Sequence, residues 1–426
     1  MPQHYSRRSV NKAALILMFA AVLAGSCQNL DRSIDPFPIA MEVRAGAVFV
    51  GATDQNGERL PVTVDTLSPL TILDSFTGEG MLPTPKRLAL DLRLFSQGSS
   101  TAERIRFPNT EIFDIHPCSR DGAPQNCLIG VDGNSTLSRG TIGTNVLGLQ
   151  AVRFDFVQSE LRFFPDIAGT NSERSMLCEA VLAKLFAGSG TLKIADGELD
   201  YIGLRPAVGA CLDDSDPTAS GEVLEERGID TLLVISTGIG ISILAESTYN
   251  EFARTFSQPL AADLPEVMMH LPSGPVRARL GHIGHLTLTG DIGDNNEQRG
   301  PCGELYANRL IAEELCSDGT IADGECPCPN GENFCRVGAS ILLKDMIEVA
   351  VVDDQHPLLQ ALRVELRPAF PELGGVLGAS ALAPTRADFD YPNQRLLLRC
   401  LDPSRCQVRP QIVSRADLPA IQKCLP

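Results

Sequence analysis

The feature that most constrains this chain is an internal repeat of two sequence elements, which occur in the same order in both halves. The first is an apolar run that leads into a polar turn, at residues 62–73 and again at 232–244. The second reaches a glycine and then a Phe-Asp-aromatic run, at residues 141–156 and 376–391. The two copies lie 171 residues apart for the first element and 235 for the second. The repeat therefore predicts two similarly folded halves, with an insertion in the second.

Most of the remaining sequence has the pattern of short strands. Stretches of helical period are scarce, and Gly, Pro, Asn and Asp interrupt the apolar runs. A hairpin turn is predicted at Asp54–Gly57, and a helix between the halves at Ser172–Phe186, where apolar residues have helical spacing. The pattern indicates an all-β protein with few short helices. Strands are predicted at residues 41–44, 47–50, 60–64, 88–95, 152–156, 161–164, 232–235, 276–280, 286–289, 347–352 and 396–398.

In content and order, the repeated elements resemble the pepsin-like aspartic proteases and their single-lobe retroviral-type relatives. In that family a buried strand ends in Asp-Thr-Gly, and a later strand ending in glycine passes through the loop that carries the aspartate. Two such turns meet at a pseudo-twofold axis, where one carboxylate and one carboxylic acid hold a water molecule. The resemblance covers roughly residues 40–165 and 200–400. It implies a bilobed pepsin-like fold, with two related β-barrel-like lobes and a cleft between them.

The resemblance assigns roles to residues of both halves. Asp65 falls on the first catalytic aspartate, and Thr66 falls on the threonine that braces it. In the second half Thr237 and Gly238 match the corresponding turn. The glycines of the two later strands, which let the backbones approach closely, are Gly143 and Gly378.

Two departures from the family pattern affect the expected chemistry. Ser236 stands where the second catalytic aspartate is expected, and Leu67 replaces the glycine of the first turn. A serine hydroxyl can hydrogen-bond to Asp65 but has no proton to give as an acid near neutral pH. Without a second carboxyl, no like-charge coupling keeps a proton in the site. Because loss of a positioned general acid typically costs about 10²–10⁴ in rate, we expect a catalytically inactive protein.

Three functions remain open at this stage. The leading hypothesis is a non-catalytic lipoprotein that binds a peptide or an envelope protein in the cleft. The alternative is an active aspartic endopeptidase with an atypical site centred on Asp65, for which Asp230 is a candidate second acid. The third is a purely structural envelope lipoprotein.

The N-terminal segment has the features of an export signal. Three basic residues precede an apolar run at residues 13–24, which is too short for a comfortable membrane span. The run leads to Ala24-Gly25-Ser26-Cys27, which resembles the lipobox of bacterial lipoproteins. In a lipobox the cysteine thiol receives a diacylglyceryl group before cleavage. We therefore expect Cys27 to anchor the protein in the bacterial cell envelope, preferably at the outer membrane. Ordinary secretion, with cleavage nearby, is the alternative.

Twelve cysteines follow Cys27, and an even number in an exported chain favours disulfides over a metal site. We expect the local pairs Cys118–Cys127 and Cys178–Cys211. The cluster from Cys302 to Cys335 indicates a disulfide-stapled insertion at residues 300–336. These expectations divide the chain into a signal peptide (1–26), a lipid-anchored linker (27–39), an N-terminal lobe (40–170), a connection (171–199), a C-terminal lobe (200–400) and a disulfide-tied tail (401–426).

Charge and composition limit the expected partners. The formal net charge of −17 argues against binding to nucleic acid or to anionic membrane surfaces, so membrane contact is expected through the lipid alone. No cofactor is predicted. His282 and His285 flank Gly284, but the sequence fixes no third ligand, so no metal site is predicted either. We expect a monomer.

Overall fold

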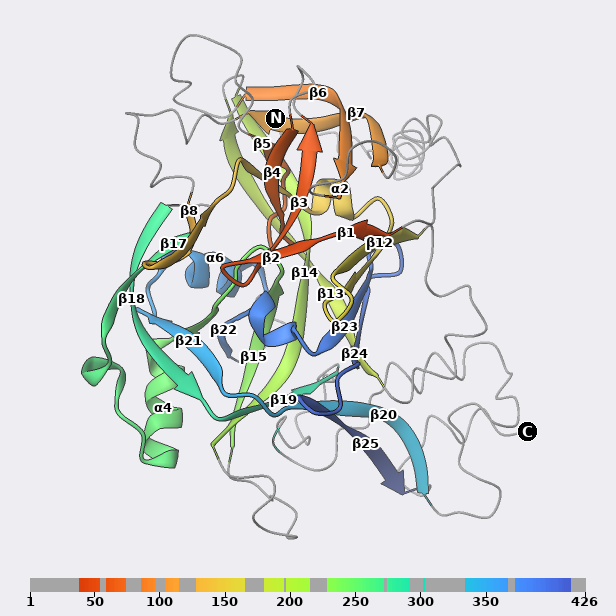
Figure 1. Cartoon of the computed structure of the whole chain (residues 1–426). Coiled ribbons are helices and arrows are strands. Elements are labelled where there is room, and N and C mark those ends of the chain that lie inside the picture. Colours follow the sequence, from red (N-terminus) through yellow and green to blue (C-terminus); the bar gives the residue numbers. More distant parts are fainter. Residues whose placement is uncertain are drawn as a thin grey trace, which may run out of the picture. The chain divides into compact units, whose positions relative to one another are not determined.

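The computed structural model describes residues 38–53, 59–73, 86–96, 104–114, 128–164, 180–194, 197–214, 228–271, 274–290, 302, 334–366 and 372–414 (Figure 1). The chain divides into two compact units, Met1–Asp35 and Pro36–Pro426, and every described residue belongs to the second unit. The residues of the predicted export signal, and Cys27, lie outside the described residues. Among the described helices, none is long and apolar enough to cross a membrane.

The first half is almost entirely strand. Its elements are β1 (Ile39–Ala40), β2 (Glu42–Arg44), β3 (Ala47–Thr53), β4 (Arg59–Val64), β5 (Ile72–Leu73), β6 (Lys86–Phe95), β7 (Arg104–Asp114), β8 (Leu128–Val131), β9 (Asn134–Leu137), β10 (Gly140–Ile142), α2 (Thr144–Leu147), β11 (Ala151–Asp155) and β12 (Glu160–Phe164).

The second half adds two longer helices to the same kind of framework. Its elements are β13 (Val181–Ile194), β14 (Gly197–Asp213), β15 (Ile229–Ser236), β16 (Ser242–Ala245), α4 (Glu246–Phe256), η4 (Ala261–Asp263), β17 (Glu266–Leu271), β18 (Gly274–Ile283), β19 (His285–Thr289), β20 (Phe334–Leu343), β21 (Ile347–Val352), α6 (Pro357–Glu365), β22 (Leu373–Gly378), η5 (Ala379–Leu382), β23 (Thr385–Asp390), β24 (Arg395–Cys400) and β25 (Cys406–Ser414).

The same arrangement of four strands occurs in both halves. In the first, β10 lies parallel to β4 and antiparallel to β5, and β5 runs parallel to β7. In the second, β22 lies parallel to β15 and antiparallel to β16, and β16 runs parallel to β21. The strands β4 and β15 each lead into the polar turn of the repeat. The structure thus confirms the expected all-β, bilobed, pepsin-like fold.

A sheet shared by both halves joins them. Its strands follow the order β1, β12, β11, β23, β24, β13. Figure 1 labels β1 beside β12 and β23 beside β24. The central strands β11 and β23 are equivalent in the repeat and pair antiparallel, with Arg153 opposite Asp388. Equivalent strands that pair antiparallel are related by a local twofold axis, so the pseudo-symmetry of the sequence is also present in space.

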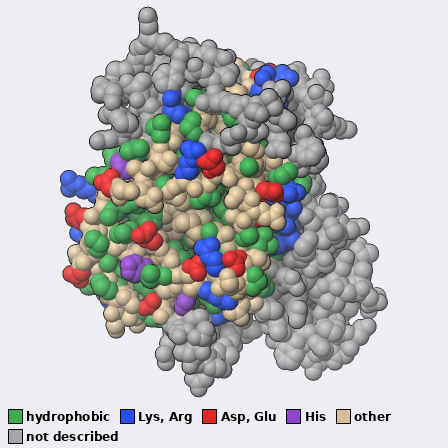
Figure 2. Space-filling view, viewed as in Figure 1, with side chains coloured by type: hydrophobic (Ala, Val, Ile, Leu, Met, Phe, Trp, Pro, Cys, Tyr) green, Lys and Arg blue, Asp and Glu red, His purple; other side chains and the backbone are tan. Residues whose placement is uncertain are grey.

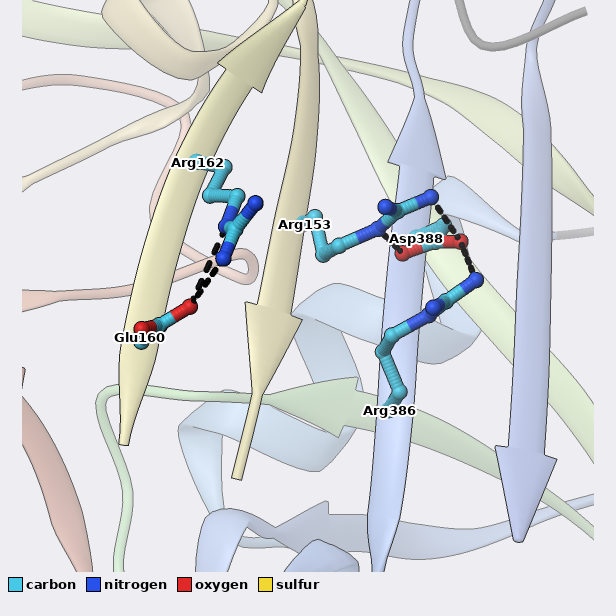
Figure 3. Close-up of polar contacts among 5 residues, drawn as sticks. All are labelled: Arg153, Glu160, Arg162, Arg386 and Asp388. Carbon is cyan, nitrogen blue, oxygen red and sulfur yellow. Dashed lines mark hydrogen bonds and ion pairs between the residues drawn. The ribbon is translucent and has the colours of Figure 1, made fainter. Parts of the chain in front are cut away.

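An ion pair lies at the centre of this shared sheet. Arg153 Nε donates to Asp388 Oδ1 at 2.7 Å and Nη2 to Oδ2 at 3.1 Å, which makes the pair bidentate (Figure 3). Arg386 adds a bond to the same carboxylate at 3.2 Å. The Asp388 side chain is 1% exposed and that of Arg153 13%, so the pair is largely shielded from water. Beneath it, Phe154 and Phe389 pack edge to face.

A second junction joins the halves away from the shared sheet. Strand β8 of the first half pairs antiparallel with β17 of the second, with Val131 opposite Met269. Asp132 N–H donates to the Met268 carbonyl at 2.9 Å. His270 Nε2 lies 2.9 Å from Asp132 Oδ1. The two halves are therefore connected by strand pairing at two separate places.

The predicted helix at Ser172–Phe186 is wrong where it can be compared. Residues 172–179 lie outside the described part, but Val181–Phe186 belong to strand β13. The alternate residues Val181, Ala183 and Leu185 are buried, and β13 pairs with β24 along the shared sheet. The spacing of apolar residues in Val181–Phe186 is compatible with the period of a helix and with that of a strand. Pairing with β24 selects the strand.

The predicted disulfide Cys178–Cys211 is also wrong. Cys211 bonds to Cys302, 91 residues away, and Cys400 bonds to Cys406. Nearness in sequence suggested the first pairing, whereas the fold places Cys211 of β14 opposite Asp230 of β15, whose carboxylate accepts a bond from Cys302 N–H at 2.6 Å. Cys118, Cys127, the Asp54–Gly57 turn and residues 303–333 of the insertion lie outside the described residues.

Candidate functional site

Asp65 directly follows strand β4, and Ser236 is the last residue of the equivalent strand β15. The side chains of the two residues are in contact. Ser236 Oγ donates to Asp65 Oδ1 at 2.7 Å. The N–H groups of Leu67 and Gly238 donate to the same oxygen at 2.9 and 3.4 Å. Ile239 N–H donates to Ser236 Oγ at 3.1 Å. The Ser236 hydroxyl thus donates one hydrogen bond, to Asp65, and accepts one, from Ile239 N–H.

The two threonines beside this pair tie the halves to each other reciprocally. Thr66 Oγ1 donates to the Ile235 carbonyl at 3.0 Å, and Thr237 Oγ1 donates to the Val64 carbonyl at 2.6 Å. The N–H of each threonine donates to the hydroxyl of the other, at 3.2 and 3.3 Å. Both threonines are fully buried. This arrangement involves a threonine in each turn and no second carboxyl.

Glycines allow the turns to pack closely. A Cβ on Gly143 would collide with the Leu70 backbone, and one on Gly378 would collide with the Gly240 carbonyl. A Cβ on Gly238 would overlap the Asp65 side chain. All three positions of the sequence motif therefore require the absence of a side chain for a steric reason.

Two hydroxyl groups that the motif comparison did not single out support these glycines. Gly143 N–H donates to Thr71 Oγ1 at 3.0 Å, and Gly378 N–H donates to Ser242 Oγ at 3.1 Å. Thr71 and Ser242 lie 171 residues apart, which is the offset of the first repeated element. A comparison of hydroxyl residues at that offset would have found them.

The environment of Asp65 favours its neutral form. The residue is 4% exposed, and burial raises the pKa of its carboxyl above the usual value. Hydrogen bonds from Leu67, Ser236 and Gly238, and the positive charge of Arg205, oppose this rise in the pKa without cancelling it. Burial also raises the pKa of the Tyr391 hydroxyl, and the negative charge of Asp65 raises that pKa further. Burial at this position therefore disfavours the ionised form of Asp65.

Leu67 fills the space beside the pair. It is 6% exposed and packs in a cluster with residues of the second half, among them Ala207, Val234 and Ile239. The Leu67 side chain is therefore part of the hydrophobic core between the two turns.

The structure does not bring Asp230 to Asp65. Asp230 lies near the start of β15, six residues before Ser236, which corresponds to about 20 Å along a strand. Its carboxylate accepts the bond from Cys302 N–H, and burial raises its pKa. Among the described residues, the charge that acts on the Asp65 pKa is the cation Arg205, and no described carboxylate does so.

No described group of three or more His, Cys, Asp or Glu side chains is placed to hold a metal ion. His282 and His285 belong to the successive strands β18 and β19, where they pair opposite Glu348 and Asp213 respectively.

Two related β-rich halves, a shared sheet on a local twofold axis and interlocked threonine turns define the pepsin-like aspartic-protease fold. Some solved structures are similar to this chain at low sequence identity. One is an aspartic proteinase from Irpex lacteus, 12% identical, with a TM-score of 0.38, covering 85% of this chain and 97% of that one.

Two seed proteins are similar to the same extent. Basic 7S globulin from soybean is 12% identical, with a TM-score of 0.38, covering 85% of this chain and 95% of that one. Conglutin gamma, a basic 7S globulin from lupine seeds, is 13% identical, with a TM-score of 0.37, covering 85% and 93%. No protein-family model matches the chain, and no curated protein sequence matches it.

Proposed function

We propose that this protein is a catalytically inactive, aspartic-protease-like lipoprotein of the bacterial cell envelope, which binds a peptide or an envelope protein without cleaving it. The observation that carries the inactivity is the 2.7 Å bond from Ser236 Oγ to Asp65 Oδ1 at the place where two carboxyl groups are needed. Acid catalysis requires a group that can release a proton at the scissile amide, and a serine hydroxyl does not do so near neutral pH.

Binding without cleavage is the role that fits a retained fold with one carboxyl. An extended peptide can be held by backbone hydrogen bonding to strands, which needs no acid or base. On the face in Figure 2, basic, acidic and hydrophobic side chains are interspersed over the described part, which fits recognition by shape and backbone better than by one sign of charge. Because Asp65 is almost wholly buried, the bound segment is expected to contact the chain outside the Asp65–Ser236 pair.

Peptide cleavage is the direct test of inactivity. The purified protein is incubated with a mixed peptide library from acidic to neutral pH, beside D65N as the control. We expect no cleavage by either protein, and retention of a subset of peptides by both. Cleavage by the native protein that disappears in D65N contradicts the proposal, and absence of both cleavage and retention favours the purely structural alternative.

The lipid anchor is tested separately at Cys27. Cells that express the full chain are labelled with a radioactive fatty acid, and C27S is compared with the native sequence. We expect the label and the membrane fraction to be lost in C27S, because the thiol is the only attachment point that the lipobox resemblance supplies. A C27S protein that stays labelled contradicts the lipoprotein assignment.

The active-enzyme alternative is favoured by one observation, the intact reciprocal bonding of Thr66 and Thr237. If the turns are held in working geometry, S236D places a second carboxyl within contact of Asp65 and restores like-charge coupling.

We expect S236D/L67G to gain acid-dependent peptide cleavage that is absent from the native chain. Equal cleavage by the native chain contradicts the proposed inactivity, and D65N/S236D/L67G is the matched control.

A further inference from the structure

One hydrogen bond of the first half has no counterpart of the same kind in the second. Val48 N–H donates to the Thr237 carbonyl at 2.9 Å and so supports the turn of the opposite half. In the repeat, Thr63 corresponds to Val234. These residues pair with Phe49 and Ala207 respectively. The residue that corresponds to Val48 in the second half is therefore Pro206.

Proline has no N–H group, so Pro206 cannot donate the mirror-image bond to the turn that carries Asp65. The preceding residue, Arg205, reaches that turn with its side chain, because its Nη1 donates to the Leu67 carbonyl. Leu67 N–H in turn donates to Asp65 Oδ1. Leu67 thus accepts a hydrogen bond from Arg205 at its carbonyl and donates one to the Asp65 carboxyl from its N–H.

The guanidinium of Arg205 is itself held on the far side. Nε and Nη2 donate to the two carboxylate oxygens of Glu365 at 2.6 and 2.9 Å, and the side chains are only 4% and 8% exposed. Glu365, the last residue of α6, lies against Gly188, where any side chain would collide with it. Tyr201 hydrogen-bonds to both members of the pair. Burying an ion pair is costly, and it is tolerated when geometry and further hydrogen bonds satisfy both partners.

We propose that Arg205 is a positioning residue for Asp65, which holds the turn of the first half in place of the backbone hydrogen bond lost at Pro206, with Glu365 orienting its guanidinium. The asymmetry between the halves follows directly. One turn is supported by a main-chain donor and the other by a buried side chain. This inference goes beyond the proposed function, and it holds for a binding site as for a catalytic one.

The test is the titration of Asp65 itself. Protein labelled with ¹³C at aspartate carboxyls is titrated by NMR, and D65N identifies the Asp65 signal. In R205M the Leu67 turn loses its anchor and a nearby positive charge is removed, so the Asp65 midpoint is expected to rise relative to the native chain. R153M is the matched control, because it removes an arginine from another shielded ion pair while leaving the Asp65 turn intact.

A second set of variants separates positioning from simple stabilisation. P206A restores an N–H at the position equivalent to Val48, so R205M/P206A is expected to recover the native Asp65 midpoint in part, whereas R153M/P206A gains nothing. R205K keeps the positive charge but lacks the planar guanidinium that bonds to Glu365 and Leu67 together. It replaces R205M in the test if R205M does not fold. An Asp65 midpoint in R205M or R205K that matches R153M, with no rescue by P206A, overturns the proposal and leaves Arg205 as a structural ion pair.

Discussion

At the scale of single residues, the Asp65 carboxyl is under two opposed influences. Burial raises its pKa, while three hydrogen bonds and the Arg205 charge favour the ionised form. Since the pKa in the folded state lies above that in the unfolded state, the stability that Asp65 contributes is complete below the ordinary pKa. It is lost as the pH rises through the raised value.

This sign leads to a prediction for D65N, which remains neutral at every pH. Measured by denaturant unfolding, the free energy of unfolding of D65N relative to the native chain is expected to increase as the pH rises from acid to neutral. Other carboxyl groups contribute equally to both proteins, so the difference isolates Asp65. A relative stability of D65N that falls with rising pH contradicts the assignment of a raised pKa.

The buried hydroxyl of Thr237 gives a second prediction. In T237V the shape is retained, but the Val64 carbonyl loses its 2.6 Å donor and Thr66 N–H loses its acceptor. A buried polar group without a partner costs about 1–3 kcal/mol, so T237V is expected to lower the free energy of unfolding by that order. T255V is the control, because the Thr255 hydroxyl bonds within an exposed helix surface. An equal decrease in the free energy of unfolding of T237V and T255V contradicts a stabilising role for the reciprocal hydrogen bonds of Thr66 and Thr237.

Sequence reasoning reached some of these residues and not others. Asp65, Ser236 and the two threonines were found because a repeat with a constant offset marks positions that meet on an axis. Arg205 and Glu365 were not found, since they lie 160 residues apart and neither belongs to the repeated motif. Arg205 is a charged residue in the mostly buried end of β14 and Glu365 is the last residue of α6, and neither position identifies the partner.

At the scale of elements, the shared sheet concentrates the contact between the halves on two equivalent strands. The buried Asp388 carboxylate accepts bonds from Arg153 and from Arg386, so its removal leaves both cations poorly compensated. Breaking a buried ion pair by changing one partner typically costs about 3–5 kcal/mol.

We therefore expect D388N to lower the free energy of unfolding by about 3–5 kcal/mol. The double variant R153M/D388M is expected to lose less than the sum of R153M and D388M, because it removes both charges together. Chemical denaturation of all variants in one buffer measures the coupling. Additive losses contradict a direct interaction between the two side chains across β11 and β23.

The elements also show where periodicity misleads. Most predicted strands are confirmed, because turn residues bounded them clearly. The segment at Val181–Phe186 was expected to be helical from its spacing of apolar residues, yet it forms the edge of the shared sheet. A six-residue run is compatible with either period, and only the presence of β24 alongside it selects the strand. Information of that kind is tertiary and cannot be obtained from the segment itself.

At the scale of the whole molecule, duplication explains how much the sequence could predict. The two copies of each element fixed the class of fold and the meeting of Asp65 with Ser236. The junction of β8 with β17 belongs to neither repeated element, so nothing in the sequence pointed to it. The bond between Cys211 and Cys302 was missed for a related reason, because the two cysteines are 91 residues apart and other cysteines are nearer.

The β8–β17 junction has a consequence for the order in which the chain can fold. Strand β8 lies within the first 131 residues, but its hydrogen-bonding partners on β17 appear about 138 residues later in the chain. Until β17 has been synthesised, strand β8 of the first half therefore has an unpaired edge. Pairings between such distant segments slow folding and leave edges available to wrong partners. The β8 edge, like that of β11 before β23 is made, is therefore open to wrong partners while the chain is being synthesised.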